Sequence, residues 1–139
     1  FLTAAMTIGS LSGVTVFAAD ASTDENVEMA DASDVDGTTI TFWHSMGGVN
    51  GEAIDTLVKK FNDENEYGIT VDAQYQGEYD DSLNKLKSAQ IGNMGADLVQ
   101  VYEIGTRFMI DSGWIVPMQQ MIDADSYDVS EIEPNLAAY

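Results

Sequence analysis

The chain's single histidine lies in a short group of residues that could take part in catalysis or in ligand recognition. Trp43, His44 and Ser45 follow one another where an alternating segment gives way to Gly47 and Gly48. A serine nucleophile would need a strained turn and a base from another segment, whereas adjacent side chains at a strand end point in opposite directions. Catalysis by His44 and Ser45 is therefore disfavoured. Two interpretations stay open: a hydrogen-bonded loop histidine, or a set of residues that faces a ligand.

Glu103 is the strongest candidate for a ligand contact. It closes the apolar run LVQVY, and a carboxylate there can accept hydrogen bonds from two neighbouring hydroxyl groups of a polyol. Tyr79 and Tyr102 would add ring faces and phenol groups, and Trp43 an apolar platform for a sugar-like ligand. The alternative role of Glu103 is to cap the helix expected at 105–112, and both roles stay open. These residues suit recognition better than turnover, so we expect no enzyme activity.

Several kinds of chemistry are excluded by composition or by spacing. The chain has no cysteine, which rules out disulfides, thiolate catalysis and cysteine-based zinc sites. An EF-hand starting at Asp123 would need Gly at its sixth position and Glu at its twelfth, where this chain has Asp128 and Pro134. The adjacent Asp80 and Asp81 are interpreted as helix N-caps rather than as an acid-base pair. No phosphate-binding or dinucleotide-binding fingerprint occurs, so we expect neither a metal nor a cofactor.

The charge balance argues against a further class of function. Lys and Arg total 5 against 24 Asp and Glu, which makes a formal net charge of −19. Nucleic-acid binding requires clustered basic residues, and a chain this acidic is repelled by anionic membrane surfaces. We expect no nucleic-acid partner, and we attribute the acidity mainly to solubility.

The first 37 residues are predicted to be a secretion signal followed by a linker. Residues 1–19 are uncharged, apolar and rich in small residues, and they end in a small-x-small cleavage pattern. Val14 occupies the position where a lipoprotein signal would have its cysteine, so we expect export without a lipid anchor, to the periplasm or the cell surface. Residues 20–37 contain seven acids and no base, which predicts a disordered acidic linker. No stable membrane insertion of the mature domain is expected.

From residue 38 onward the hydrophobic pattern alternates between strand and helix periods. Strands are predicted at 38–43, 68–77 and 96–103, and helices at 50–65, 80–92 and 105–112. In the first helix Asn50 is the expected N-cap, and an apolar stripe is formed by Ile54, Leu57, Val58 and Phe61. Single helices between strands predict right-handed crossovers and a mostly parallel sheet. Ligands bind such sheets at the carboxyl ends of the strands, where the candidate residues above are found.

Three motifs resemble the extracellular solute-binding proteins of ABC importers, in the large carbohydrate-binding group called family 1. The motifs are TITFWHSMGG, YQGEYDDSLNKL and LVQVYEIGT, in this order, and the likeness covers residues 38–139. Within this group they are most similar to members that bind sn-glycerol 3-phosphate. The chain departs from the group at Gly95 and Ala96, where a Pro-Asp pair is common before the third strand.

The resemblance implies a periplasmic-binding-protein-like fold of type II, in which two α/β lobes close on a ligand. This chain would supply the N-terminal part of the first lobe, an incomplete lobe with a mostly parallel sheet flanked by helices. In the family, the tyrosine that ends Y-x-G-x-Y and the glutamate of QVYE contact the ligand, and these match Tyr79 and Glu103. Trp43, His44 and Ser45 match the strand-exit motif and would line or support the cleft.

The function implied by the resemblance is the capture of sn-glycerol 3-phosphate or a glycerophosphodiester outside the cytoplasm, for delivery to an ABC permease. An alternative of the same class is a sugar-binding or oligosaccharide-binding protein. A distant alternative is an exported hydrolase that uses Glu103 with Asp80 or Asp81. We expect this chain to be the N-terminal piece of a larger protein and, because half a cleft rarely binds tightly, to bind little on its own.

Overall fold

The structure, a computed structural model, describes residues 32–92 and 94–137. The predicted secretion signal and most of the predicted acidic linker lie outside these described residues. Within the last part of that linker, a helical turn, α1 (Ala32–Val35), is present. Val35 is buried, and its carbonyl accepts a hydrogen bond from Thr38 N–H (3.0 Å), which leads the chain into the first strand.

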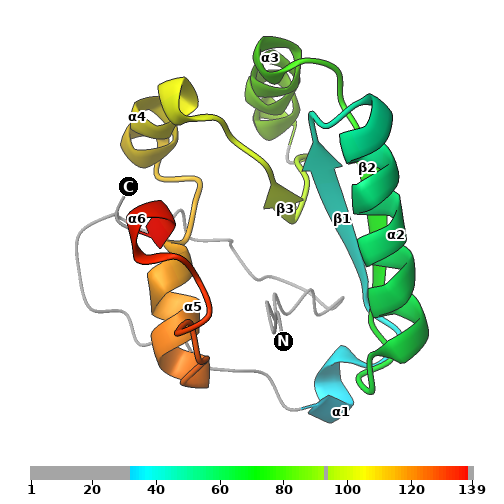
Figure 1. Cartoon of the computed structure of the whole chain (residues 1–139). Helices are drawn as coiled ribbons and strands as arrows, with labels where there is room; N and C mark the ends of the chain where they lie inside the picture. Colours follow the sequence, from blue (N-terminus) through cyan, green and yellow to red (C-terminus); the bar gives the residue numbers. More distant parts are fainter. Residues whose placement is uncertain (1–31, 93, 138–139) are drawn as a thin grey trace. The chain divides into compact units, whose positions relative to one another are not determined.

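A three-stranded parallel sheet organises the unit formed by residues 31–109. Its strands are β1 (Thr39–His44), β2 (Thr70–Tyr75) and β3 (Leu98–Val99), in the order β2-β1-β3. The helix α2 (Gly48–Glu64) connects β1 to β2, and α3 (Tyr79–Ile91) connects β2 to β3 (Figure 1). The predicted fold class, α/β with a parallel sheet flanked by helices, is confirmed.

The two connecting helices cover opposite faces of the sheet. The chain moves from β1 to β2 in one direction and from β2 across to β3 in the other. Since both crossovers are right-handed by preference, they place α2 and α3 on opposite faces. The side chains agree with this arrangement. The position before α2, Gly47, lies beside the Tyr75 ring, whereas Leu86 of α3 lines the same hollow as Val99 of β3.

Asn62 of α2 and Asn65 just after it bind the backbone of β2 and of the residue that precedes this strand. The Asn62 amide donates to Val71 O (3.0 Å) and accepts from Val71 N–H (2.8 Å), as a neighbouring strand would. Asn65, the C-cap, donates to Phe61 O and Ile69 O (both 2.9 Å) and accepts from the N–H of Ile69 (3.0 Å). These bonds satisfy backbone groups on the outer edge of β2 and at the helix end, where otherwise only water could pair with them.

Three details of α2 and α3 differ from the predictions. The N-cap of α2 is Gly47 rather than Asn50, because the helix already begins at Gly48, whose φ is +55°. Leu57 of the predicted apolar stripe is 64% exposed, so the inward stripe does not include it. The helix α3 begins at Tyr79, which places Asp80 and Asp81 inside the first turn; the helix dipole still favours their charges there.

The third strand is much shorter than predicted. Its ladder with β1 covers Leu98 and Val99, paired with Phe42 and Trp43, and ends in the bond from Gln100 N–H to Trp43 O (2.9 Å). The following helix, α4 (Glu103–Ser112), begins two residues earlier than predicted. The tyrosine and the glutamate after this strand therefore belong to a loop and a helix start.

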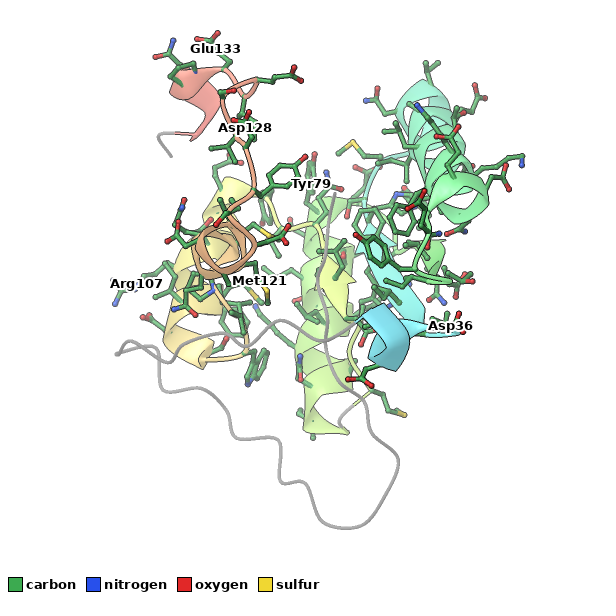
Figure 2. All side chains as sticks on the ribbon, turned by 90° about the horizontal axis from the view of Figure 1, so that it is seen from below. Asp36, Tyr79, Arg107, Met121, Asp128 and Glu133 are labelled. Carbon is green, nitrogen blue, oxygen red and sulfur yellow. The ribbon has the colours of Figure 1, made fainter. Side chains whose placement is uncertain are left out.

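The described residues 110–137 belong to another compact unit. It contains α5 (Met118–Asp125) and α6 (Pro134–Ala137), neither of which the hydrophobic pattern indicated. Ser126 ends α5 in the left-handed region, at φ +52°. Most described side chains of this unit are exposed. Asp128, labelled in Figure 2, is one of them, and its pKa is lowered by the hydrogen bonds from Ser130. Among the described helices of both units, none is long and apolar enough to cross a membrane.

Candidate functional site

Tyr79 and Glu103 occupy equivalent positions in the fold. Each is the first residue of a helix that follows a strand of the parallel sheet: Tyr79 begins α3 after β2, and Glu103 begins α4 after β3. The carboxyl ends of parallel strands lie at the same edge of a sheet, where ligands bind in open α/β folds. Both helix starts also carry the partial positive charge of a helix N-terminus, which suits polar ligand groups.

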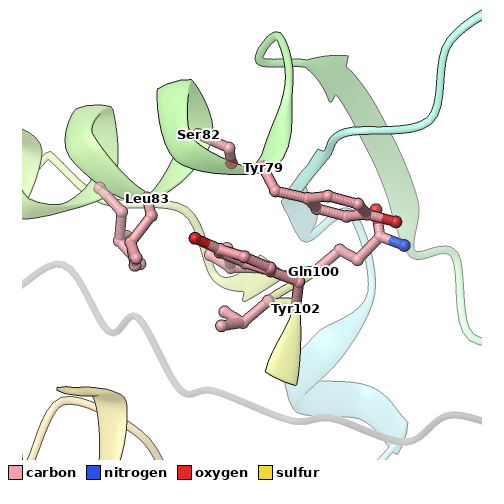
Figure 3. A pocket seen from close by; sticks show the side chains of 8 residues that line it. Tyr79, Ser82, Leu83, Gln100 and Tyr102 are labelled. Carbon is pink, nitrogen blue, oxygen red and sulfur yellow. The ribbon is translucent and has the colours of Figure 1, made fainter. Parts of the chain in front are cut away.

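Two tyrosines, Tyr79 and Tyr102, connect the starts of α3 and α4. The rings of Tyr79 and Tyr102 are stacked, with centroids 5.1 Å apart and planes 13° from parallel (Figure 3). The Tyr102 hydroxyl donates a hydrogen bond to Oδ1 of Asp80, the second residue of α3. This bond is the main cause of a raised pKa of the Tyr102 phenol, and the negative charges of Asp80 and Glu103 raise it further.

A narrow hollow lies beneath the two rings. Its lining residues come from the first half of α3 and from the segment that runs through β3 toward α4: Tyr79, Ser82, Leu83, Leu86, Val99, Gln100, Val101 and Tyr102 (Figure 3). Leu86 and Ser82 are almost fully buried at its base. The hollow measures about 180 Å³ with the space at its mouth, below the roughly 300 Å³ at which ligand pockets begin. This part of the chain can thus form one wall of a site.

The helix α4 approaches this wall closely because its third residue is glycine. A Cβ at Gly105 would lie 2.7 Å from Val101 Cγ1 and 3.5 Å from a methyl group of Leu83. Gly105 is buried, and its N–H donates to Tyr102 O (2.9 Å). The glycine therefore allows the start of α4, which carries Glu103, to pack against the loop that carries Tyr102.

Trp43 and His44 point to opposite faces of the sheet. Trp43 pairs in register with Val99, which places its ring on the α3 side, and its Nε1–H donates to Gln74 Oε1 (3.2 Å). His44 instead lies between the rings of Phe42 (centroids 5.6 Å apart) and Tyr75 (6.0 Å), on the α2 side. One ligand could not contact both side chains from within the strand, because neighbouring strand residues alternate between faces.

His44 and Ser45, which follow Trp43 in the strand-exit motif, are both buried. His44 is 3% exposed and Ser45 is 7% exposed. In the described part of the chain, His44 Nδ1 and the Ser45 hydroxyl find no hydrogen-bond partner. The Ser45 backbone N–H donates to Gln100 Oε1 (3.0 Å), so a side chain from the β3 exit fixes the β1 exit. As they stand, His44 and Ser45 support the sheet edge rather than present polar groups to solvent.

The surroundings of Tyr79 are negatively charged. Four acidic side chains are exposed around the two helix starts: Glu78, Asp80, Asp81 and Glu103. Lys85 is the nearby base on α3, and its Nζ donates to Gln76 O (2.8 Å) at the β2 exit. Such a wall suits hydroxyl groups, which can donate to carboxylates, better than an anion. Among the described acidic and histidine side chains, no group of three or more is arranged to hold a metal ion.

Two residues of this arrangement were missed as site residues by the sequence reasoning. Asp80 was interpreted as a cap, and Gln100 was not considered. The sequence predicts a ring face and a phenol group for Tyr102, but not its bond to Asp80. Asp80 bonds to a residue 22 positions away in the sequence, and Gln100 to one 55 positions away. No local sequence pattern predicts such contacts. Gln100, a polar residue inside the apolar run LVQVY, was the one available signal.

Comparison with known proteins supports the resemblance drawn from the motifs. The chain is 39% identical over 106 residues to the sn-glycerol-3-phosphate-binding periplasmic protein UgpB of Salmonella typhimurium, and this match includes 73% of the chain. It is 37% identical over 115 residues, 80% of the chain, to the protein of the same name from Escherichia coli. The chain spans about a quarter of the length of these curated relatives (24% and 25%). No model of a protein family matches it. The predicted relationship to solute-binding proteins of this kind is confirmed.

Proposed function

We propose that the protein that carries this chain is an exported solute-binding component of an ABC importer, which captures sn-glycerol 3-phosphate or a glycerophosphodiester for a membrane permease. The chain would be the N-terminal part of its first lobe, in a periplasmic-binding-protein-like fold of type II. The observation that carries this proposal is the placement of Tyr79 and Glu103 as first residues of two helices at one edge of a parallel sheet. The names of the relatives, which bind sn-glycerol 3-phosphate, support the choice of ligand.

The chemistry of the wall indicates which end of the ligand it would bind. Glu103 can accept hydrogen bonds from two adjacent hydroxyl groups, and Tyr79 can donate or accept through its phenol and cover C–H groups with its ring. The exposed carboxylates of Asp80 and Asp81 disfavour a phosphate at the same place. We assign the glycerol end to Tyr79 and Glu103, and we assign the phosphate to parts of the protein beyond this chain.

The remaining residues of the predicted site are assigned supporting roles. Trp43 is half-buried on the α3 side, where it can extend the apolar wall toward the ligand. His44 and Ser45 are buried and hold the β1 exit in place. The predicted secretion signal at 1–19 would direct export of the domain, and residues 20–37 would form the acidic linker between the signal and the folded part. Because one wall does not enclose a ligand, the 139-residue chain alone should bind little.

The test is calorimetric titration of the complete mature protein with sn-glycerol 3-phosphate, with maltose as the comparison ligand. Glu103→Gln should weaken binding about 10-fold, because a neutral amide replaces a charged acceptor, and Tyr79→Phe should weaken it about 5-fold. Glu52→Gln is the matched control, since it removes one exposed negative charge from α2, outside this wall. Equal affinities of Glu103→Gln and the control would remove Glu103 from the site.

The same titration separates the alternatives. Binding of maltose without sn-glycerol 3-phosphate would favour the sugar-binding alternative and discard the proposed ligand. Hydrolysis of a glycerophosphodiester, abolished in Glu103→Gln, would favour the exported hydrolase. We expect bound ligand to be recovered unchanged.

A further inference from the structure

We propose that Asp80 and Tyr102 are positioning residues, which fix the spacing between Tyr79 and Glu103 by joining the start of α3 to the start of α4. This inference rests on the proposed function, because it concerns the same site. It assigns a role to two side chains that would not themselves have to touch the ligand.

The hydrogen bond connects the immediate neighbours of the two ligand-contacting residues. Asp80 follows Tyr79 in α3, and Tyr102 precedes Glu103 at the start of α4. The bond from the Tyr102 hydroxyl to Asp80 Oδ1 therefore spans the gap between two helix starts that are far apart in sequence. Its carboxylate acceptor makes it stronger than a bond between neutral groups. A change in the separation of the helix starts would break it.

The stacked rings constrain a second direction. The Tyr102 ring lies against the Tyr79 ring at 5.1 Å, nearly parallel, and its hydroxyl end is held by Asp80. A phenol ring held at its hydroxyl end cannot turn about its side-chain torsions without breaking that bond. Tyr79 is 37% exposed, so without this partner its side chain would have rotamer freedom at the surface.

The short third strand explains why such a connection matters here. The β1–β3 ladder ends at the bond from Gln100 N–H to Trp43 O, three residues before Glu103. Past that point, the contacts that hold the start of α4 include the packing of Gly105 against Val101 and Leu83 and the bond between Asp80 and Tyr102. One turn further on, the Lys87 ammonium of α3 lies 4.5 Å from the centre of the Phe108 ring. Apolar packing is weakly directional, whereas a hydrogen bond sets a distance and an angle. The polar contact therefore helps to set where Glu103 is presented.

A competing explanation is that Asp80 only stabilises the N-terminus of α3 through the helix dipole. Asp81 provides the matched control for this explanation. It lies in the same first turn of α3, carries the same charge and is also exposed, but it makes no hydrogen bond to Tyr102 among the described contacts. A dipole effect predicts equal consequences for the two aspartates, and a positioning role predicts a consequence for Asp80 alone.

The experiment measures the affinity of the complete mature protein for sn-glycerol 3-phosphate by calorimetry. The variants are Asp80→Ala, Tyr102→Phe, the double variant, Asp80→Glu and the control Asp81→Ala. Asp80→Ala and Tyr102→Phe should each weaken binding about 10-fold, and the double variant should lose no more than either single variant, because both remove the same bond. Asp80→Glu keeps a carboxylate and should remain within about 3-fold of the wild type. Asp81→Ala, which removes the same charge but no bond to Tyr102, should not weaken binding.

Thermal unfolding of each ligand-free variant is recorded in parallel. A positioning role predicts lost affinity at an unchanged melting temperature, with rescue by Asp80→Glu. Wild-type affinity in both single variants, additive losses in the double variant, or equal losses in the variants of Asp80 and Asp81 would each overturn this inference while leaving the proposed function in place. A wild-type protein that does not bind sn-glycerol 3-phosphate would overturn the proposed function, and this inference with it.

Discussion

The side-chain amide of Asn62 pairs with both backbone groups of Val71, donating to the carbonyl at 3.0 Å and accepting from the N–H at 2.8 Å. Val71 is the second residue of β2, an outer strand of the sheet in the described part of the chain. The helix that crosses over from β1 thus satisfies two backbone groups of an open strand edge with a single side chain. Uncovered edges invite pairing with other chains, so this contact protects the sheet as well as stabilising it.

Asn62→Ala should destabilise the complete protein by about 1 to 2 kcal/mol, because it removes two half-buried hydrogen bonds. Denaturant unfolding measures the change. Asn50→Ala is the control: Asn50 is exposed near the start of the same helix, and its replacement should change stability by less than about 0.5 kcal/mol. Equal losses of stability in both variants would mean that the pairing of Asn62 with Val71 does not stabilise the protein.

Gly105→Ala should destabilise the protein by about 1 to 3 kcal/mol, since the new Cβ would lie 2.7 Å from the stiff Val101 side chain. It should also weaken ligand binding, because α4 would have to shift together with Glu103. Gly92→Ala is the matched control. Its φ of −101° suits any residue, and its added Cβ would meet the flexible end of Met94 at 3.4 Å. A Gly105→Ala protein with wild-type stability and affinity would contradict the close approach of α4.

His44→Phe should preserve or slightly raise stability, by up to about 1 kcal/mol, because it keeps a ring beside Phe42 and Tyr75 and removes a buried nitrogen that has no partner in the described residues. Ligand affinity should stay within about twofold of the wild type, as expected for a supporting residue. His44→Ala would leave a cavity and cost about 3 kcal/mol. A large loss of affinity in a stable His44→Phe protein would instead place His44 in contact with the ligand.

The stability of the folded protein should fall in alkaline solution, as Tyr102 loses its proton. The bond to Asp80 raises the pKa of Tyr102 in the folded state above its ordinary value of about 10, so the folded protein holds this proton more tightly than the unfolded chain. The resulting stabilisation is complete below the unfolded-state pKa and is lost as the pH rises through the folded-state value.

Ultraviolet titration of tyrosinate in the folded protein measures this directly. Asp80→Ala should lower the pKa of Tyr102 toward its ordinary value, and Tyr102→Phe should remove that titration step. A Tyr102 pKa that is the same with and without the Asp80 carboxylate would show that the two groups do not interact in solution.

The sequence by itself determined the class of fold and the residues most suited to contact a ligand. Alternating apolar residues at 38–43 and 68–77, separated by one helical pattern, require parallel strands with a crossover, because side chains repeat every 2 residues in strands and every 3.6 in helices. The position of Tyr79 and Glu103 at the carboxyl ends of strands followed from the same patterns. These are local properties of the chain.

Tertiary structure decided which of the candidates lie together. The sequence places Trp43, His44 and Ser45 side by side, but the sheet sends Trp43 toward α3 and buries the other two. Conversely, Asp80 and Tyr102 are 22 positions apart, and nothing in the sequence connects them. In the structure they form the hydrogen bond that joins the two helix starts. The extent of β3 was decided in the same way. The run LVQVY has strand character along its whole length, but its pairing with β1 stops after Val99, since a strand is defined by the partner that completes its hydrogen bonds.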